Sequence, residues 1–174
     1  TVNLARIALD TNSEEEYLKE LEKRAYINLI ALDRVRHIIK RNVEKGLLPN
    51  FTYNLVDFPS LYNTIGFIGI YETMKKFDYI RVDELGDTYY TDKASAFGEK
   101  IFKTMRATAD RFIKENNCDY QINTEQIPGE SAAAKLMKKD KFFYPNANIY
   151  DLPLYGNQFI PLGIKTTGQE RVRI

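Results

Sequence analysis

The chain has 174 residues, of which 44% are hydrophobic, so it is long enough to bury the core of one ordinary domain. Its 25 Lys and Arg residues nearly balance its 24 Asp and Glu residues, which leaves a formal net charge of +1. Because this balance gives no overall field that attracts polyanions, we expect neither nucleic acid nor a membrane surface as a partner. The sequence shows no apolar run of the roughly 18 residues that a spanning helix needs, and its first residues lack the basic start of a secretory signal. We therefore expect a cytoplasmic protein.

The first two predicted elements are a short strand and a long helix. Residues 2–9 alternate loosely between apolar and polar side chains, which predicts a strand with Asn3 on one face. Residues 13–16, Ser-Glu-Glu-Glu, form a capping box with three acidic residues at the positive end of a helix dipole. Apolar residues then recur at helical spacing until Gly46 and Pro49, which predicts a helix of about 30 residues and roughly 45 Å. Such a length favours packing along a larger assembly.

The middle of the chain carries two glycines and a second long helix. Residues 51–60 read as a connection, and residues 61–74 read as a helix in which Gly66 and Gly69 lie on one face and allow another backbone to approach closely. A turn follows at Gly86. Thr91 then begins a helix that runs to about Asn116 with a continuous apolar stripe.

The last third contains a strand, a tight turn and a helix. Residues 118–127 alternate as a strand does and stop at Pro128 and Gly129, after which Glu130 opens an alanine-rich helix. The first N–H groups of a helix lack internal partners and carry the positive end of the dipole, so this turn is suited to phosphate. An ordinary turn and helix start is the alternative interpretation. Residues 142–174 hold three of the nine glycines and three of the six prolines and read as loops.

Cysteine and histidine each occur once, as Cys118 and His37. A single cysteine excludes a disulfide within the chain, and one cysteine with one histidine cannot build the usual four-ligand zinc site. No basic residue or histidine adjoins Cys118 in the sequence. We therefore expect both residues to be structural.

Four segments, in order, resemble the anaerobic (class III) ribonucleotide reductases. Residues 123–133, Asn-Thr-Glu-Gln-Ile-Pro-Gly-Glu-Ser-Ala-Ala, resemble the family's strand that ends in Glu, a polar residue and Pro-Ala-Glu-Ser. Residues 1–8 are similar to its Ile-Asn-Leu-Pro-Arg-Ile-Ala stretch, and residues 65–72 to its Ile-Gly-x-x-Gly-x-x-Glu helix. Residues 155–161 resemble its Tyr-Thr-Asn-Ser-x-x-x-Pro loop. Ala5 and Gly129 depart from the family's usual Pro and Ala.

The resemblance implies an α/β fold, as part of a ten-stranded α/β barrel of the ribonucleotide reductase and glycyl radical enzyme type. Residues 1–174 would be an internal fragment of that barrel. The loop with the thiyl cysteine would precede residue 1, and the glycyl radical and zinc domain would follow residue 174. Because Cys118 does not match the thiyl position, we expect the isolated fragment to be inactive.

The resemblance also implies site residues. Asn3 would hydrogen-bond the ribose hydroxyls, since an amide donates and accepts without adding charge. The substrate phosphates would bind at the helix start formed by Pro128, Gly129, Glu130, Ser131 and Ala132. Either Glu125 or Glu130 would face the ribose, and the spacing leaves this choice open.

The implied function is reduction of ribonucleoside triphosphates to deoxyribonucleotides, an oxidoreductase activity. We expect no cofactor within the fragment itself, whereas the whole enzyme would use a glycyl radical, a structural zinc and ATP or dNTP effectors. Expected partners are the ribonucleoside triphosphate, the remainder of the polypeptide, a radical-SAM activating enzyme and a second copy in a homodimer. The alternative is a helical interaction module without catalytic activity, in which residues 13–46 present a partner face.

Overall fold

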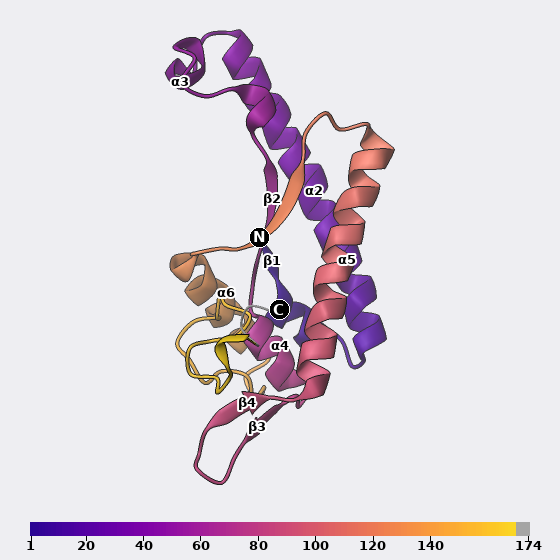
Figure 1. Ribbon diagram of the computed structural model, residues 1–174, viewed down its shortest axis with the longest axis vertical. Helices are drawn as coiled ribbons and strands as arrows, with labels where there is room; N and C mark the ends of the chain where they lie inside the picture. The colour runs from indigo at the N-terminus through magenta and orange to yellow at the C-terminus, as the bar shows by residue number, and fades with distance from the viewer. Residues whose placement is uncertain (170–174) are drawn as a thin grey trace.

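The computed structural model describes residues 1–169 and has an α/β architecture built on a three-stranded parallel sheet. The strands are β1 (Val2–Asn3), β2 (Asn63–Ile68) and β5 (Ile122–Gln126), in the order β1-β2-β5. The long helices α2 (Glu14–Glu44) and α5 (Asp92–Asn116) lie together on one side of the sheet, and α6 (Glu130–Phe143) lies on the other (Figure 1). The predicted α/β class is confirmed.

The two faces of the sheet differ in chemistry. Val2, Ile65, Phe67 and Ile122 are buried in the main core with apolar residues of α2 and α5. Side chains of adjacent strand residues point to opposite faces. The other face therefore carries Asn3, Thr64, Gly66, Ile68, Asn123 and Glu125, which are in register across the strands. Ile68 packs with Ala133 and Met137 of α6 in a second, smaller core.

The predicted helix over residues 13–46 is confirmed as α2. The Ser13 hydroxyl accepts a hydrogen bond from the backbone N–H of Glu16 at 3.2 Å, as expected of a capping box. Glu16 in return accepts from the backbone N–H of Asn12 at 2.9 Å, one residue before the expected partner. Gly46 follows the helix with a positive φ of 69°, a conformation that suits glycine.

The prediction of a strand over residues 2–9 is wrong beyond Asn3. Residues Leu4–Asp10 form helix α1, and Asn3 is its N-cap. The buried residues Leu4, Ala5, Ile7 and Ala8 have the spacing of one helix face, which a loose alternation also satisfies. The cap favours the helix over the strand, because the Asn3 side chain accepts the backbone N–H of Arg6. In a strand, that N–H would instead pair with a neighbouring strand.

The prediction of a helix over residues 61–74 is also wrong in its first half. Residues Asn63–Ile68 form β2, Gly69 turns the chain with a φ of 84°, and α4 (Ile70–Lys76) follows. β2 is buried along most of its length between two layers, and a buried parallel strand reads as a continuous apolar run. The expected close approach does occur at Gly69, where an added Cβ would lie 2.9 Å from the backbone nitrogen of Ala5.

The remaining elements complete the arrangement. The connection after α2 contains the short helices α3 (Pro49–Thr52) and η1 (Phe58–Ser60), and the turn at Gly86 joins the hairpin strands β3 (Ile80–Val82) and β4 (Thr88–Tyr90). Thr91 caps α5, so that predicted helix is confirmed. The predicted strand over residues 118–127 is confirmed as the shorter β5.

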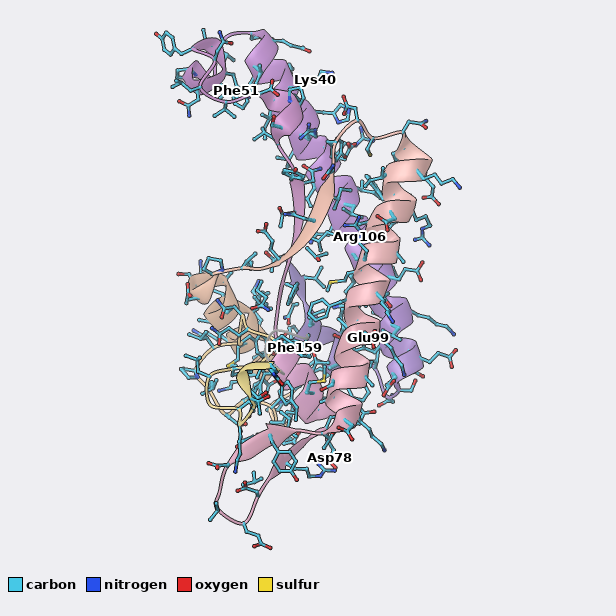
Figure 2. All side chains as sticks on the ribbon, viewed as in Figure 1. Lys40, Phe51, Asp78, Glu99, Arg106 and Phe159 are labelled. Carbon is cyan, nitrogen blue, oxygen red and sulfur yellow. The ribbon has the colours of Figure 1, made fainter. Side chains whose placement is uncertain are left out.

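The segment from residue 144 to residue 167 is irregular, as predicted, whereas residues 142 and 143 still belong to α6 and residues 168 and 169 are helical. Residues 170–174 of that prediction lie outside the described part of the chain. Phe159 anchors the irregular segment against α5 (Figure 2). An added Cβ at Gly98 would lie 2.4 Å from Cζ of Phe159, so the missing side chain makes the space for this ring. The hydroxyl of Tyr90 donates to the carbonyl of Phe159 at 2.7 Å. Within residues 1–169, no helix has both the length and the apolar character needed to cross a bilayer.

Arg36 fastens the far end of α2 to the loop before β2. It is buried, donates to the carbonyls of Leu61 at 2.7 Å and Phe58 at 3.3 Å, and lies between the rings of Phe58 and Tyr120. A lysine offers neither the planar stacking nor the forked donors. We expect Arg36→Lys to lower the free energy of unfolding by about 1–3 kcal/mol, the usual cost of unsatisfied buried polar groups. Chemical denaturation checks this, and Arg34→Lys, at an exposed position of the same helix, is the control that should change little. Equal stabilities would contradict this role of Arg36.

Candidate functional site

The predicted site residues gather at the carboxyl edge of the parallel sheet. Val2 and Gln126 are both paired with Phe67 of the central strand. The two outer strands therefore end at the same level on either side of it, about 10 Å apart. Asn3 follows Val2 directly, and the Pro128 turn follows β5. The strand that carries Asn3 and the strand that leads to the Pro128 turn therefore end at the same edge of the sheet.

Asn3 is held from two directions. Its side-chain Oδ1 accepts a hydrogen bond from the backbone N–H of Arg6 at 3.1 Å and so caps α1. Its Nδ2 donates to Oδ2 of Asp140 at 2.9 Å. An amide has one further N–H and one further lone pair, and these are the groups it can still offer to a ligand.

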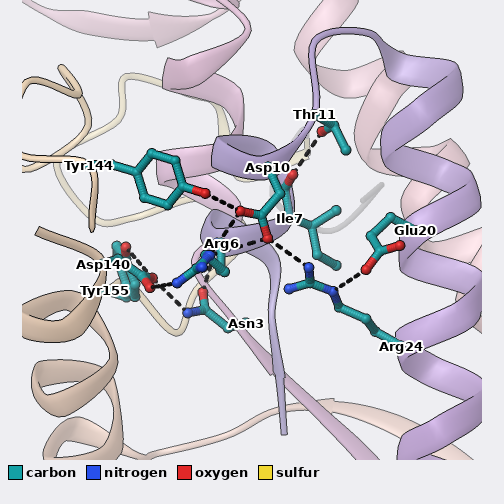
Figure 3. Close-up of polar contacts among 10 residues, drawn as sticks. All are labelled: Asn3, Arg6, Ile7, Asp10, Thr11, Glu20, Arg24, Asp140, Tyr144 and Tyr155. Atoms are coloured by element: carbon teal, nitrogen blue, oxygen red, sulfur yellow. Dashed lines mark hydrogen bonds and ion pairs between the residues drawn. The ribbon is translucent and has the colours of Figure 1, made fainter. Parts of the chain in front are cut away.

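Asp140 lies at the centre of this network, on the last turns of α6 (Figure 3). Its side chain is buried and also accepts from Arg6 Nη1 at 3.0 Å and from the Tyr155 hydroxyl at 2.8 Å. Burial and the bond to Asp140 both raise the pKa of Tyr155, so this phenol remains a neutral donor. Burial lowers the pKa of Arg6, but its bonds to Asp140 and Asp10 outweigh burial and raise it.

A second carboxylate extends the network to α2. Asp10 accepts from Arg6 at 3.0 Å, from Arg24 at 2.7 Å and from the hydroxyl of Tyr144 (Figure 3). Burial raises the pKa of Asp10, but these donors outweigh it and hold the pKa below its ordinary value. Arg6 thus joins two anionic side chains and fixes α1 between α2 and α6.

The start of α6 is open. Gly129 is the N-cap residue and no side chain caps the helix, while Glu130, Ser131 and Ala132 are exposed. Ala133 makes the first backbone bond, to the carbonyl of Gly129 at 2.8 Å. The preceding N–H groups therefore have no capping side chain, and free N–H groups at a helix start are suited to binding an anion.

Of the two candidate carboxylates, Glu125 shares the sheet face of Asn3. Asn123 orients it, since its Nδ2 donates to Oε1 of Glu125 at 2.8 Å while its Oδ1 accepts from the Thr64 hydroxyl at 2.6 Å. Glu125 is exposed and lies beside Gly66, which has no side chain to cover it. Glu130 is on the exposed start of α6 instead.

Glu72 is a buried carboxyl next to the same edge. It lies on α4, is 1% exposed, and its Oε1 accepts from the backbone N–H of Gly156 at 3.0 Å. The N–H of Gly69 donates to the carbonyl of Gly156 at 2.7 Å, so both the N–H and the carbonyl of Gly156 are hydrogen-bonded. Burial is the main cause that raises the pKa of Glu72, to about 7. Its Oε2 is buried without a hydrogen-bond partner.

The sequence interpretation found Asn3 and the α6 turn but missed the groups that connect them. Asp140 and Tyr155 were not singled out as site residues, although Tyr155 opens a segment that resembles the family. Cys118 is half-buried and His37 is exposed on α2, where its Nδ1 lies 2.8 Å from the carbonyl oxygen of Asp33. Residues 1–169 contain no cluster of three or more side chains suited to a metal.

A cavity of about 570 Å³ lies away from this edge, between α5, β4 and the C-terminal segment. Tyr90, Glu99, Phe102 and Lys103 are among the residues that line it, and none of the predicted site residues does.

The chain matches known proteins over nearly its whole length. The family model described as anaerobic ribonucleoside-triphosphate reductase matches residues 1–173. A crystal structure of the anaerobic ribonucleotide reductase from Thermotoga maritima with citrate in the active site aligns with 99% of this chain at 33% identity and a TM-score of 0.86. The structure of that reductase with dATP and CTP aligns equally well. This chain spans 30% and 28% of those two chains. No curated protein matches it.

Proposed function

The chain belongs to the anaerobic ribonucleoside-triphosphate reductase family, and from this premise we propose that it forms part of the catalytic barrel of such a reductase. The proposed activity of the whole polypeptide is reduction of ribonucleoside triphosphates to deoxyribonucleotides. This part of the polypeptide would supply contacts to the ribose and to the phosphates. The observation that carries the proposal is the shared sheet edge, where the strand that bears the oriented Asn3 amide and the strand that leads to the uncapped start of α6 end about 10 Å apart.

In this proposal each group has one role. The free N–H and lone pair of Asn3 hydrogen-bond the ribose hydroxyls, because a neutral amide can serve a donor and an acceptor at once. The N–H groups of residues 130–132 and the positive end of the α6 dipole bind the phosphates. Glu125 is the carboxylate beside the ribose, since it shares the sheet face of Asn3.

The remaining functional groups would come from the rest of the polypeptide. A thiyl cysteine formed from a glycyl radical would supply the radical chemistry, and we propose that Cys118 is not that cysteine. We further propose a structural zinc, ATP or dNTP effectors, a radical-SAM activating enzyme, a homodimer and a cytoplasmic location for the whole enzyme. The structure of the Thermotoga maritima reductase with dATP and CTP supports nucleotide binding by this family.

A negative charge introduced at the start of α6 tests whether this helix start binds the substrate phosphates. An aspartate in the first turn of a helix stabilises the helix but repels a phosphate. We therefore expect Ser131→Asp in the full-length enzyme to weaken ribonucleoside triphosphate binding by at least about 10-fold, a loss of about 1.4 kcal/mol, without lowering the melting temperature. Calorimetric titration measures the affinity, and differential scanning calorimetry measures the melting temperature.

Two substitutions serve as controls. Ser131→Ala removes the hydroxyl without adding charge, and Gly129→Ala adds a Cβ that would lie 3.3 Å from the flexible end of Ile127. Both should retain most of the affinity. Unchanged binding by Ser131→Asp would exclude the α6 start as the phosphate site.

A further inference from the structure

We propose that Asp140 is a positioning residue that sets the orientation of the Asn3 amide and couples it to the helix that receives the phosphates. This inference rests on the proposed function. Asp140 itself has no free route to a substrate, because it is only 2% exposed and accepts from Asn3, Arg6 and Tyr155. It therefore acts on a ligand only through a neighbour.

The bonds of Asn3 allow one orientation of its amide. Its oxygen faces the backbone N–H of Arg6, and its nitrogen faces a carboxylate oxygen of Asp140. Rotating the amide by half a turn would bring oxygen against the carboxylate and N–H against N–H. Both contacts would be repulsive, so Asp140 and the Arg6 N–H together determine which side of the amide offers its spare N–H and which offers its spare lone pair.

Asp140 is itself held rigidly. Its Oδ2 accepts both Asn3 and the Tyr155 hydroxyl, while Oδ1 accepts the Arg6 guanidinium. A buried carboxylate is tolerated when it is paired and hydrogen-bonded, and these three donors meet that condition. The side chain lies on the buried face of α6 with Ala133 and Met137, so the packing of the helix sets its position.

The same helix carries the two ends of the proposed site. Its open start lies at residues 130–132 and Asp140 lies about 15 Å further along its axis. A shift of α6 on phosphate binding would therefore be passed to Asn3 through one hydrogen bond of 2.9 Å. The geometry points to Asp140 as the group that fixes the position of the ribose-binding Asn3 amide relative to the phosphate-binding start of α6.

A double-mutant cycle in the activated full-length reductase tests this inference. We expect Asp140→Asn to lower kcat for the ribonucleoside triphosphate by about 10-fold to 100-fold, the usual cost of a reacting group misplaced by about 1 Å. KM should change less than about 3-fold, since the phosphate contacts remain. In an Asn3→Ala background, Asp140→Asn should have little further effect on kcat, because a residue that acts through Asn3 has nothing left to position.

Two further variants keep the result interpretable. Asp110→Asn removes an exposed carboxylate that pairs with Arg106 on α5, and it should match the wild type. If Asp140→Asn does not yield folded protein, Tyr155→Phe replaces it in the same cycle. That variant removes one donor from Oδ2 and keeps the ring, and it should give a smaller decrease that also disappears in the Asn3→Ala background.

The outcomes separate the two proposals. If Asn3→Ala alone leaves turnover unchanged, the proposed ribose contact fails and this inference fails with it. If Asn3→Ala has a large effect but Asp140→Asn or its substitute has none, the proposed function stands and the positioning role is overturned. Equal, additive decreases in both backgrounds would also overturn it, because they would indicate a general structural effect.

Discussion

Replacing Gly69 by alanine is expected to lower the free energy of unfolding by about 2–5 kcal/mol. The left-handed conformation, with a φ of 84°, costs a residue with a Cβ about 1–2 kcal/mol. The new Cβ would also lie 2.8 Å from the Cβ and 2.9 Å from the backbone nitrogen of Ala5. These are parts of the packed α1 start and cannot rotate away, so overpacking adds about 1–3 kcal/mol.

Gly46→Ala is the matched control for this substitution. Gly46 also has a positive φ, of 69°, but an added Cβ would meet nothing within 4 Å. Only the conformational cost then applies, about 1–2 kcal/mol. Urea denaturation of both variants measures the difference. Similar losses at the two positions would show that α4 does not approach α1 as closely as the structure indicates, and would remove the support for the position of Asn3.

The second large effect concerns the ionisation of Glu72. The pKa of this buried carboxyl is about 7 in the folded chain, against an ordinary value of 4.5. The folded state therefore binds more protons than the unfolded state between these values, and stability falls as pH rises through them. The difference corresponds to about 3 kcal/mol, which is lost between about pH 4.5 and pH 7 and not regained above it.

Glu72→Gln tests this pH dependence. The amide oxygen can still accept from Gly156, but the side chain does not ionise. The free energy of unfolding of the variant, relative to the wild type, should therefore increase by about 3 kcal/mol between pH 4.5 and pH 8. Denaturation series across this pH range measure it, with the exposed Glu84→Gln as the control that should show no such change. Parallel curves for the variant and the wild type would contradict a raised pKa at Glu72.

Local signals in the sequence were sufficient for the long helices and for the turn before α6. Capping residues and apolar stripes identify α2 and α5 because each helix carries its start, its stop and its buried face within its own sequence. The Pro128 turn is likewise local, and it lies where the sequence predicted.

The errors at residues 2–9 and 61–74 have a tertiary cause. A buried strand and one face of a helix give similar apolar runs, and only the neighbours decide between them. β2 is a strand because β1 and β5 flank it, and α1 is a helix because Asn3 caps it. The glycine pair was correctly associated with close approach, but Gly69 acts at a strand–helix junction and Gly66 makes room for Ile127.

The sequence analysis did not identify Asp140 as a site residue because its neighbours in the sequence are charged. It stands among Lys138, Lys139 and Lys141, and a run of charged residues at the end of a helix usually faces solvent. The available signal was its spacing, since Ala133, Met137 and Asp140 fall on one helix face. Its partners Asn3 and Arg6 are more than a hundred residues away in the sequence, so no local pattern could have indicated the pairing.

The central claim is that one ribonucleotide lies between the Asn3 amide and the start of α6. A structure of the full-length enzyme with a ribonucleoside triphosphate bound under anaerobic conditions tests it most directly. The account predicts a ribose hydroxyl within hydrogen-bonding distance of the Asn3 amide, and phosphate oxygens at the backbone N–H groups of residues 130–132. A nucleotide bound only elsewhere, for example in the cavity beside Tyr90 and Lys103, with Asn3 and the α6 start both without ligand, would contradict it.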